Sequence, residues 1–225
     1  MFYEPDKDDH GLRYNPYKSI VVPRPIGWIS TVSTEGIVNL APYSQFNNLA
    51  YDPPYVMFSA ASFPESGRRK DSAKNAADTG EFVVNMATYD LREAVNITSR
   101  FVPPEVDEAA LAGLEMIPSH LVKPPRVKAS PVHLECKFHS SLALPARVRD
   151  QVHHLVIGRV VGVHIRDDAL TPEGKLDVAK IRLARLGYFD YTYVDKVFTM
   201  RPDGPLGDHR EAGLEGRPVR KEKVS

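Results

Sequence analysis

Cysteine is almost absent from this sequence, because Cys136 is the only one among 225 residues. A single thiol excludes an intramolecular disulfide and any zinc or iron–sulfur site built from several cysteines. Cys136 lies in an alternating run, on the apolar side with Leu134 and Phe138. We therefore expect it to be a buried, unreactive thiol.

An excess of either charge is also missing. Lysine and arginine number 29, as do aspartate and glutamate, so the formal net charge is zero. A nucleic-acid-binding protein normally carries a basic excess or stripe, and none is evident before the last residues. No apolar run approaches the roughly 20 residues that span a bilayer, and residues 1–10 do not form a secretory signal. The sequence thus predicts a cytoplasmic protein that binds neither nucleic acid nor membranes.

What the chain does contain is a series of strand-like segments with a few helices between them. Runs of β-branched and aromatic residues bounded by turn signals mark the strands, and periodic apolar positions mark the helices. The predicted strands are 26–32, a returning strand from residue 37, 55–60, 81–86, 132–144 and 153–165, and the predicted short helices are 70–77, 89–98 and 106–112. Gly158 and Gly162 in the last strand indicate tight bends or close backbone approach.

This order of elements favours a mainly β barrel with a few peripheral helices over a doubly wound parallel sheet. From residue 200 onward proline, glycine and charged residues dominate. We therefore predict one domain over residues 1–200, followed by a flexible C-terminal tail over residues 201–225.

Several short motifs follow one another in a fixed order along this domain. They are 22–31 (VPRPIGWIST), 38–47 (VNLAPYSQFN), 52–59 (DPPYVMFS), 70–75 (KDSAKN) and 79–85 (TGEFVVN). Each motif alone is weak, but together they resemble the flavin reductase-like family of FMN-binding split β-barrels. That family includes the flavin reductases of two-component monooxygenases and flavoredoxin. The resemblance extends from about residue 17 to residue 200.

The resemblance implies a six-stranded Greek-key barrel, a homodimer, and one FMN per subunit near the dimer interface. It also implies an oxidoreductase that transfers a hydride from NADH or NADPH to FMN, with FAD as a second candidate flavin. The reduced flavin would pass to a partner monooxygenase or directly to another acceptor. Hydride transfer requires stacking and orientation more than a protein acid or base, so we name no catalytic residue.

Candidate flavin contacts follow from the resemblance and from the chemistry of FMN. A phosphate binds cations and backbone N–H groups at the start of a helix, and residues 68–72 offer both. The alternative is a solvated charged loop that Ser72 caps. The predicted contacts are Trp28, Ser30, Thr31, Asn39, Leu40, Ala41, Pro42, Ser44, Asn47, Ser59, Arg68, Arg69, Lys70, Asp71, Ser72, Asn75 and Tyr188.

Some of these residues also have a structural interpretation, which the sequence leaves open. Trp28 either lines the flavin ring or packs in the barrel core. Asn47 either contacts the ring or caps a turn, and isolated serines and threonines on strands are usually structural. In the segment Arg185-Leu186-Gly187-Tyr188, Tyr188 replaces the second glycine of the family's Arg-Leu-Gly-Gly stretch. That replacement affects access to the flavin ring.

Other chemistries are disfavoured. The histidines show no helical spacing with a carboxylate, and His153 and His154 point to opposite faces of a strand, so no metal site is predicted. Asp107 and Glu108 resemble helix-start residues rather than a catalytic carboxylate pair. Two rival functions remain: a flavoredoxin-like electron carrier that retains FMN without nicotinamide activity, and a flavin-free barrel used structurally or for partner binding.

Overall fold

The computed structural model describes residues 1–7, 9–63, 66–147, 151–180 and 183–200. The chain divides into two units, Met1–Val194 and Asp195–Ser225. In the second unit the described residues, 195–200, form neither helix nor strand. The predicted tail, 201–225, lies outside the described residues, and the domain boundary at residue 200 stays a prediction.

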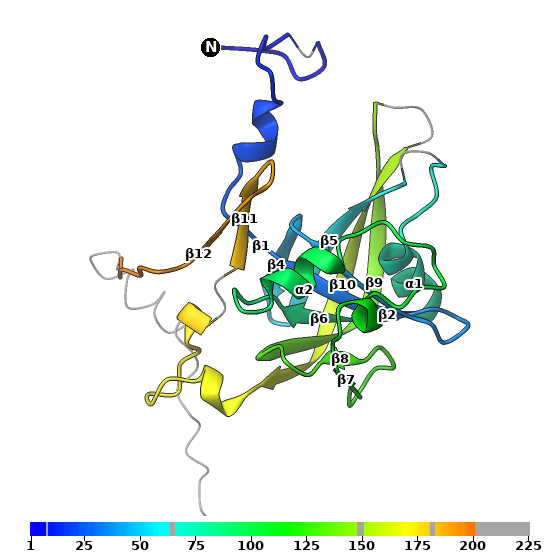
Figure 1. Ribbon diagram of the computed structural model, residues 1–225, viewed down its shortest axis with the longest axis vertical. Coiled ribbons are helices and arrows are strands. Elements are labelled where there is room, and N and C mark those ends of the chain that lie inside the picture. Colours follow the sequence, from blue (N-terminus) through cyan, green and yellow to red (C-terminus); the bar gives the residue numbers. More distant parts are fainter. Residues whose placement is uncertain (8, 64–65, 148–150, 181–182, 201–225) are drawn as a thin grey trace, which may run out of the picture. The chain divides into compact units, whose positions relative to one another are not determined.

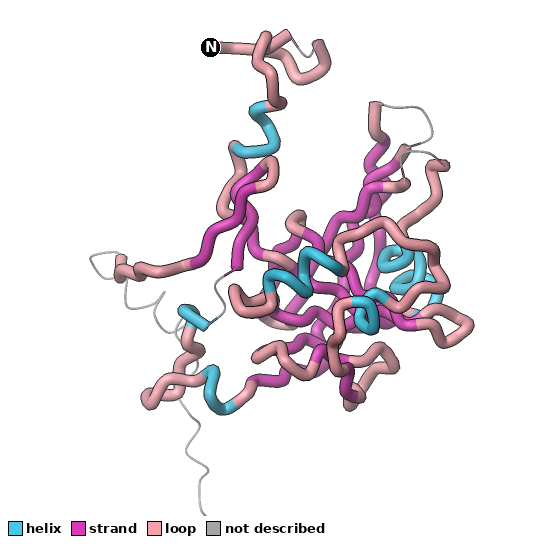
Figure 2. The backbone as a smooth tube through the Cα atoms, viewed as in Figure 1, coloured by secondary structure: helices cyan, strands magenta, loops and turns pink. Residues whose placement is uncertain are grey.

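Strands make up most of the secondary structure of the first unit (Figure 2). The strands are β1 (Arg24–Pro25), β2 (Gly27–Val32), β3 (Val38–Tyr43), β4 (Phe46–Tyr51), β5 (Pro54–Ala61), β6 (Glu81–Met86), β7 (Met116–Ile117), β8 (Arg126–Val127), β9 (Val132–Pro145), β10 (Val152–Ile165), β11 (Leu183–Gly187) and β12 (Asp190–Tyr193). The α-helices are α1 (Asp71–Thr79), α2 (Arg92–Ile97) and α3 (Glu108–Leu111), and the 3-10 turns are η1 (Pro16–Ser19), η2 (Asp167–Ala169) and η3 (Val178–Lys180). Within the described part of the chain, no helix is both long enough and apolar enough to cross a bilayer.

The main sheet is antiparallel and has the strand order β3-β2-β6-β9-β10-β5-β4 (Figure 1). Its two edge strands, β3 and β4, are consecutive in sequence and separated only by Ser44 and Gln45. At this bend the carbonyl oxygen of Gln45 accepts a hydrogen bond of 2.9 Å from the backbone N–H of Ser59. One bent segment thus links opposite edges of the sheet, as a barrel requires. We expected six strands, and the main sheet has seven because the predicted returning strand is divided here.

Two smaller sheets accompany the main one, with the orders β1-β11-β12 and β7-β8. The sequence predicted that pairing would begin near Ile26, and this prediction was wrong, because Arg24 and Pro25 already pair with β11. Strand β1 is at the edge of its sheet, where a proline without an N–H is tolerated. The hairpin β11–β12 was not predicted from the sequence.

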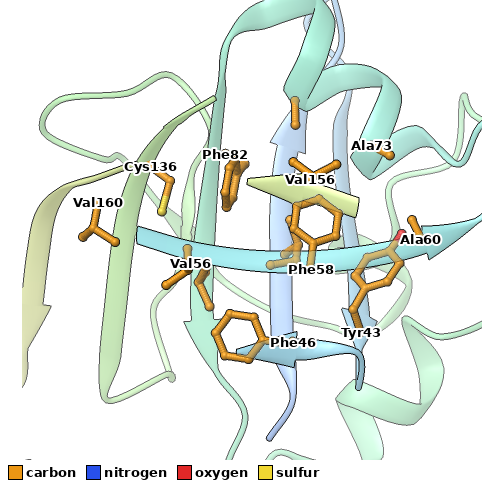
Figure 3. Packing of buried hydrophobic residues seen from close by; sticks show 13 residues of the cluster. Tyr43, Phe46, Val56, Phe58, Ala60, Ala73, Phe82, Cys136, Val156 and Val160 are labelled. Atoms are coloured by element: carbon orange, nitrogen blue, oxygen red, sulfur yellow. The ribbon is translucent and has the colours of Figure 1, made fainter. Parts of the chain in front are cut away.

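The larger core packs against the main sheet and is rich in aromatic rings (Figure 3). The ring of Phe58 lies 5.0 Å from that of Tyr43 and 5.4 Å from that of Phe82, measured between centroids. Cys136 is fully buried in the same cluster, which confirms the expected burial, and burial raises the pKa of its thiol. A Cβ atom on Gly158 would overlap the Phe82 ring, so the predicted close approach is confirmed at this glycine.

Helix α1 packs against β2 and β6 through the small side chains of Ala73 and Ala76. It begins after Lys70 and ends at Gly80, whose positive φ of 76° favours glycine. A second core, with Ile26, Trp28 and Leu40 at its centre, lies on residues of β2 and β3 and extends to α2 and α3. Both cores thus meet along β2 and β3, the strands that carry seven of the seventeen predicted flavin contacts.

Candidate functional site

A cavity of about 570 Å³ lies beside the start of α1. Its walls come from η1, β1, β3, β5, the residue before α1 and the β11–β12 hairpin. Four basic residues line it, namely Lys18, Arg24, Lys70 and Arg185, and none of the described lining residues is an aspartate or a glutamate. A cleft lined by charges of one sign concentrates ligands of the opposite charge. The cavity therefore suits an anion.

Lys70 is the cation closest to α1 in sequence, and it occupies the N-cap position of that helix. Its Nζ lies 4.6 Å from the centroid of the Phe101 ring, and burial lowers its pKa although the nearby Asp71 carboxylate opposes that shift. Within the described residues its ammonium group has no hydrogen-bond acceptor, and the N–H groups of Asp71 and Ser72 have none either. A half-buried cation next to two free N–H groups is a suitable environment for a phosphate.

The two arginines that precede Lys70 do not reach the cavity. The Nη1 atom of Arg68 donates to Asp71 Oδ1 at 2.7 Å, and its guanidinium lies 4.4 Å from the Phe63 ring. Neither Arg68 nor Arg69 lines the cavity. The predicted phosphate segment, 68–72, stays a prediction; of its basic residues Lys70 alone lines the cavity, and the Asp71 carboxylate pairs with Arg68.

Several predicted polar contacts meet in a buried hydrogen-bond network beneath α1. The Oδ1 atom of Asn39 accepts from Ser72 Oγ at 2.8 Å and from Thr31 Oγ1 at 3.4 Å, and Asn75 Nδ2 donates to Thr31 Oγ1 at 3.2 Å. All four side chains are buried. Asn39 and Ser72 also line a depression of about 40 Å³ that shares Lys70 with the large cavity. The network holds β2, β3 and α1 together at the edge of the site.

Glu108 completes this network, and sequence reasoning missed its role. Asp107 is the helix-start residue that was expected, because its carboxylate accepts from the N–H groups of Ala109 and Ala110. Glu108 instead accepts from Asn39 Nδ2 at 2.7 Å and from the N–H of Leu40 at 3.0 Å. Burial raises the pKa of Glu108, and these hydrogen bonds oppose the shift. No local pattern in the sequence indicates a contact between residues so far apart.

The remaining predicted contacts fall into two groups. Ala41 and Asp71 line the small depression, and Ser44, Ser59 and Tyr188 line the large cavity. Pro42 lines both. Trp28, Ser30, Leu40 and Asn47 line neither, and the first three are fully buried.

The hydrogen bonds of three of these residues agree with the structural interpretation, and their role as flavin contacts stays a prediction. The indole N–H of Trp28 donates to Thr98 Oγ1 at 2.9 Å inside the second core. Ser30 Oγ donates to the carbonyl of Pro125 at 2.6 Å. Asn47 is exposed on β4, where its Oδ1 accepts the N–H of Asn48 at 3.0 Å. Their side chains therefore support the strands rather than face the cavity.

Among the described residues no group of three or more His, Cys, Asp or Glu side chains is arranged to hold a metal. His133 is buried, with Nε2 donating to the carbonyl of Val127 at 2.8 Å, and His164 bonds the buried carboxylate of Glu135 at 2.5 Å. His133 is therefore a core residue that bonds the backbone.

Comparison with known proteins places this architecture in a family. The family model described as "Flavin reductase like domain" matches residues 19–195. An uncharacterized protein of Aquifex aeolicus is 39% identical over 180 residues, covering 80% of this chain and 88% of that relative.

Two solved structures show how far the fold is shared. The crystal structure of nitrilotriacetate monooxygenase component B from Bacillus cereus superposes with a TM-score of 0.81 at 29% identity, covering 89% of this chain and 98% of the other. A protein assigned as a flavin reductase with a split barrel domain, from Shewanella frigidimarina NCIMB 400, gives a TM-score of 0.75 at 21% identity, covering 90% and 100%. The mainly β split-barrel fold is thereby confirmed. This chain belongs to the flavin reductase like domain family.

Proposed function

We propose that this protein binds FMN in the basic cavity and catalyses its reduction by NADH or NADPH. The observation that carries the proposal is the cavity itself, which four basic residues line without an aspartate or glutamate among the described residues. The family match supplies the context, because it covers most of the first unit.

The residues present fit the parts of FMN. The phosphate would lie at Lys70 and the free N–H groups of Asp71 and Ser72, where a half-buried cation has no acceptor among the described residues. The flat ring needs apolar and aromatic walls with some polar groups, and Pro42, Phe101 and other lining residues offer them. FAD remains a second candidate flavin.

When bound, FMN would supply the hydride-accepting chemistry of the reaction. The chain's own residues would bind and orient the two reactants. Lys70 anchors one end of the flavin, the Asn39–Glu108 pair fixes the backbone of β3 at the site, and Tyr188 covers part of the cavity. No side chain is assigned as general acid or base, because orientation is what a hydride transfer requires.

The similarity to a monooxygenase component supports a two-component system, in which this protein delivers reduced flavin to a partner monooxygenase. We also propose that it acts in the cytoplasm as a homodimer. Both statements rest on the family relationship.

One observation favours the second candidate, a flavoredoxin-like electron carrier. Tyr188, which replaces the second glycine of the family's Arg-Leu-Gly-Gly stretch, lines the cavity. Its backbone adopts a positive φ of 46°. A bulky ring at this point restricts access to a bound flavin. An electron carrier would tolerate that restriction better than a reductase, which must admit a nicotinamide.

Absorbance spectroscopy of the purified protein tests both candidates. A flavin spectrum that bleaches quickly after anaerobic NADH or NADPH identifies a reductase and its preferred donor. A flavin spectrum that persists with both donors identifies the carrier. If no flavin bands appear even after FMN is added, both proposals are wrong and the flavin-free barrel is the remaining function.

A further inference from the structure

Strands β1 and β11 place two arginines directly opposite each other. Arg24 and Arg185 are register partners in this antiparallel pair, and both line the large cavity. Both are half-buried. Like charges directly opposite each other on neighbouring strands destabilise a sheet unless something compensates them.

Among the described residues, the acceptors that hold both guanidinium groups are all neutral. Arg24 donates to Ser44 Oγ at 3.3 Å and to the backbone carbonyls of Lys18 and Val21 at 3.2 and 2.9 Å. Arg185 donates to the hydroxyl of Tyr191 and the carbonyl of Tyr188. Neither arginine has a carboxylate partner among the described residues, so their positions are fixed while their charges are not neutralised.

Some other basic residues of the described chain do have carboxylate partners, as in the pairs Arg68–Asp71, Arg166–Asp168 and Lys128–Glu115. The whole sequence contains as many acidic as basic residues. Two preorganised guanidinium groups that lack such partners are typical of a site for phosphate or carboxylate oxygens.

We propose that Arg24 and Arg185 form a second anion-binding subsite, separate from the start of α1, which binds the diphosphate of a dinucleotide. Lys70 and the free N–H groups of α1 already suit the single phosphate of FMN. The cations that remain in the cavity are Arg24, Arg185 and Lys18, which are sufficient to neutralise the two negative charges of a diphosphate bridge. This inference rests on the proposed function, because it assigns the second reactant of the same cavity.

Two ligands carry a diphosphate of this kind, the nicotinamide donor and FAD. The charge argument applies to both, since each joins two nucleotide halves through the same bridge. The experiments therefore begin with the shared chemistry and then separate the two sources.

The first experiment measures thermal shifts of the full-length protein, with and without added FMN, at constant ionic strength. The probes are inorganic pyrophosphate and inorganic phosphate. We expect pyrophosphate to raise the melting temperature more than phosphate does, and Arg185→Gln and Arg24→Gln to lose most of that shift. Arg159→Gln is the matched control, because Arg159 is exposed on β10 and does not line the cavity.

The variants also report on the repulsion within the pair. Without ligand and at low salt, either substitution should leave the melting temperature unchanged or raise it, since one of two opposed like charges is removed. Arg185→Lys keeps the charge but lacks the two-pronged donor geometry, so we expect an intermediate pyrophosphate shift. An equal pyrophosphate shift in wild type, Arg24→Gln and Arg185→Gln would overturn the inference.

The second experiment identifies the source of the diphosphate. If the donor binds at the pair, Arg185→Gln should raise the KM for NADH or NADPH about tenfold, leave kcat nearly unchanged, and leave the FMN dissociation constant unchanged. If FAD is the ligand, the variant should weaken FAD binding about tenfold relative to FMN. A weakened affinity for FMN itself, or displacement of FMN by pyrophosphate, would assign the pair to the flavin phosphate and overturn the proposal.

The two proposals fail in different ways. If the proposed function is wrong, the wild-type protein takes up no flavin, yet the pyrophosphate titration can still be read. If only the subsite is wrong, flavin uptake is normal and the arginine variants behave like Arg159→Gln.

Discussion

Asn39 and Glu108 are joined by a hydrogen bond of 2.7 Å between Asn39 Nδ2 and Glu108 Oε1, which ties β3 to α3 across 69 residues of sequence. The second carboxylate oxygen accepts the N–H of Leu40. Since the other amide atom of Asn39 accepts from Ser72, this one residue connects the start of α1 with α3. The geometry of β3 at the cavity therefore depends on a buried carboxylate.

Replacing that carboxylate should destabilise the fold. Glu108→Ala leaves two buried donors, on Asn39 and Leu40, without their acceptor, so we expect a loss of about 3 kcal/mol in the free energy of unfolding. Urea titration at neutral pH measures it. Glu115→Ala is the control, because Glu115 is exposed and pairs only with Lys128, and such pairs contribute at most about 1 kcal/mol. Equal losses in the two variants would contradict the role given to Glu108.

Lys70→Gln should weaken FMN binding about tenfold, because it removes the charge expected to contact the phosphate. Binding of riboflavin, which has no phosphate, should not change. Fluorescence titration with both flavins gives the comparison. Arg68→Gln serves as the matched control, since Arg68 already pairs with Asp71 outside the cavity. A similar loss of riboflavin affinity in Lys70→Gln would mean that the side chain acts on the ring or on the fold.

Gly158→Ala should destabilise the protein by about 2 kcal/mol through overpacking, because the added methyl group would overlap the fully buried Phe82 ring. Gly162→Ala on the same strand is a close control. Its added methyl would lie 3.4 Å from the nearest atoms, on Glu135 and Leu121, which is an ordinary contact. That variant should be as stable as wild type or up to about 1 kcal/mol more stable. Chemical denaturation of both variants checks the difference.

The buried imidazole of His133 should make the protein sensitive to acid. Burial lowers the pKa of His133 to about 4, against an opposing effect of its hydrogen bond to Val127 O. The nearby charges on Arg126 and His164 lower it further, and Glu135 raises it. A depressed folded-state pKa gives stability that is present above the unfolded value, near 6.5, and is lost as the pH falls through about 4.

The depressed pKa of His133 alone should therefore lower the free energy of unfolding by about 2 kcal/mol as the pH falls from 7 to 5. Urea titrations at the two pH values measure the loss, and His133→Gln should show a loss smaller by that amount. His139→Gln, at an exposed position of the same strand, should keep the wild-type pH dependence. If His133→Gln also kept it, the acid sensitivity would come from another group.

Local signals in the sequence predicted the elements well where a turn residue marks each end. Strand β6 was predicted with the bounds that the structure has, and α1 was located between Lys70 and Gly80. The bend at Ser44 and Gln45 was not predicted, because nothing local distinguishes one long strand from two halves that pair with different partners. The same limit explains the missed hairpin β11–β12.

The candidate cavity contains part of the predicted contacts, and their role in flavin binding stays a prediction. Lys70, Pro42, Ser44, Ser59 and Tyr188 do line the cavity. Trp28 and Ser30 were ambiguous from the start, since strand alternation does not reveal which side of a barrel wall is covered by a second core. The pairs Arg24–Arg185 and Asn39–Glu108 depend on register and tertiary packing between distant segments, and a single sequence carries no signal for them.

The buried thiol has a practical consequence for anyone who works with this protein. Cys136 is fully buried, and it lies opposite Phe82 across the β6–β9 pair. Reagents reach the thiol only when those central strands separate. The rate at which a thiol-specific dye labels Cys136 therefore reports the rate at which the barrel opens. The wild-type chain thus carries its own reporter of unfolding kinetics, with no engineered label and no competing cysteine.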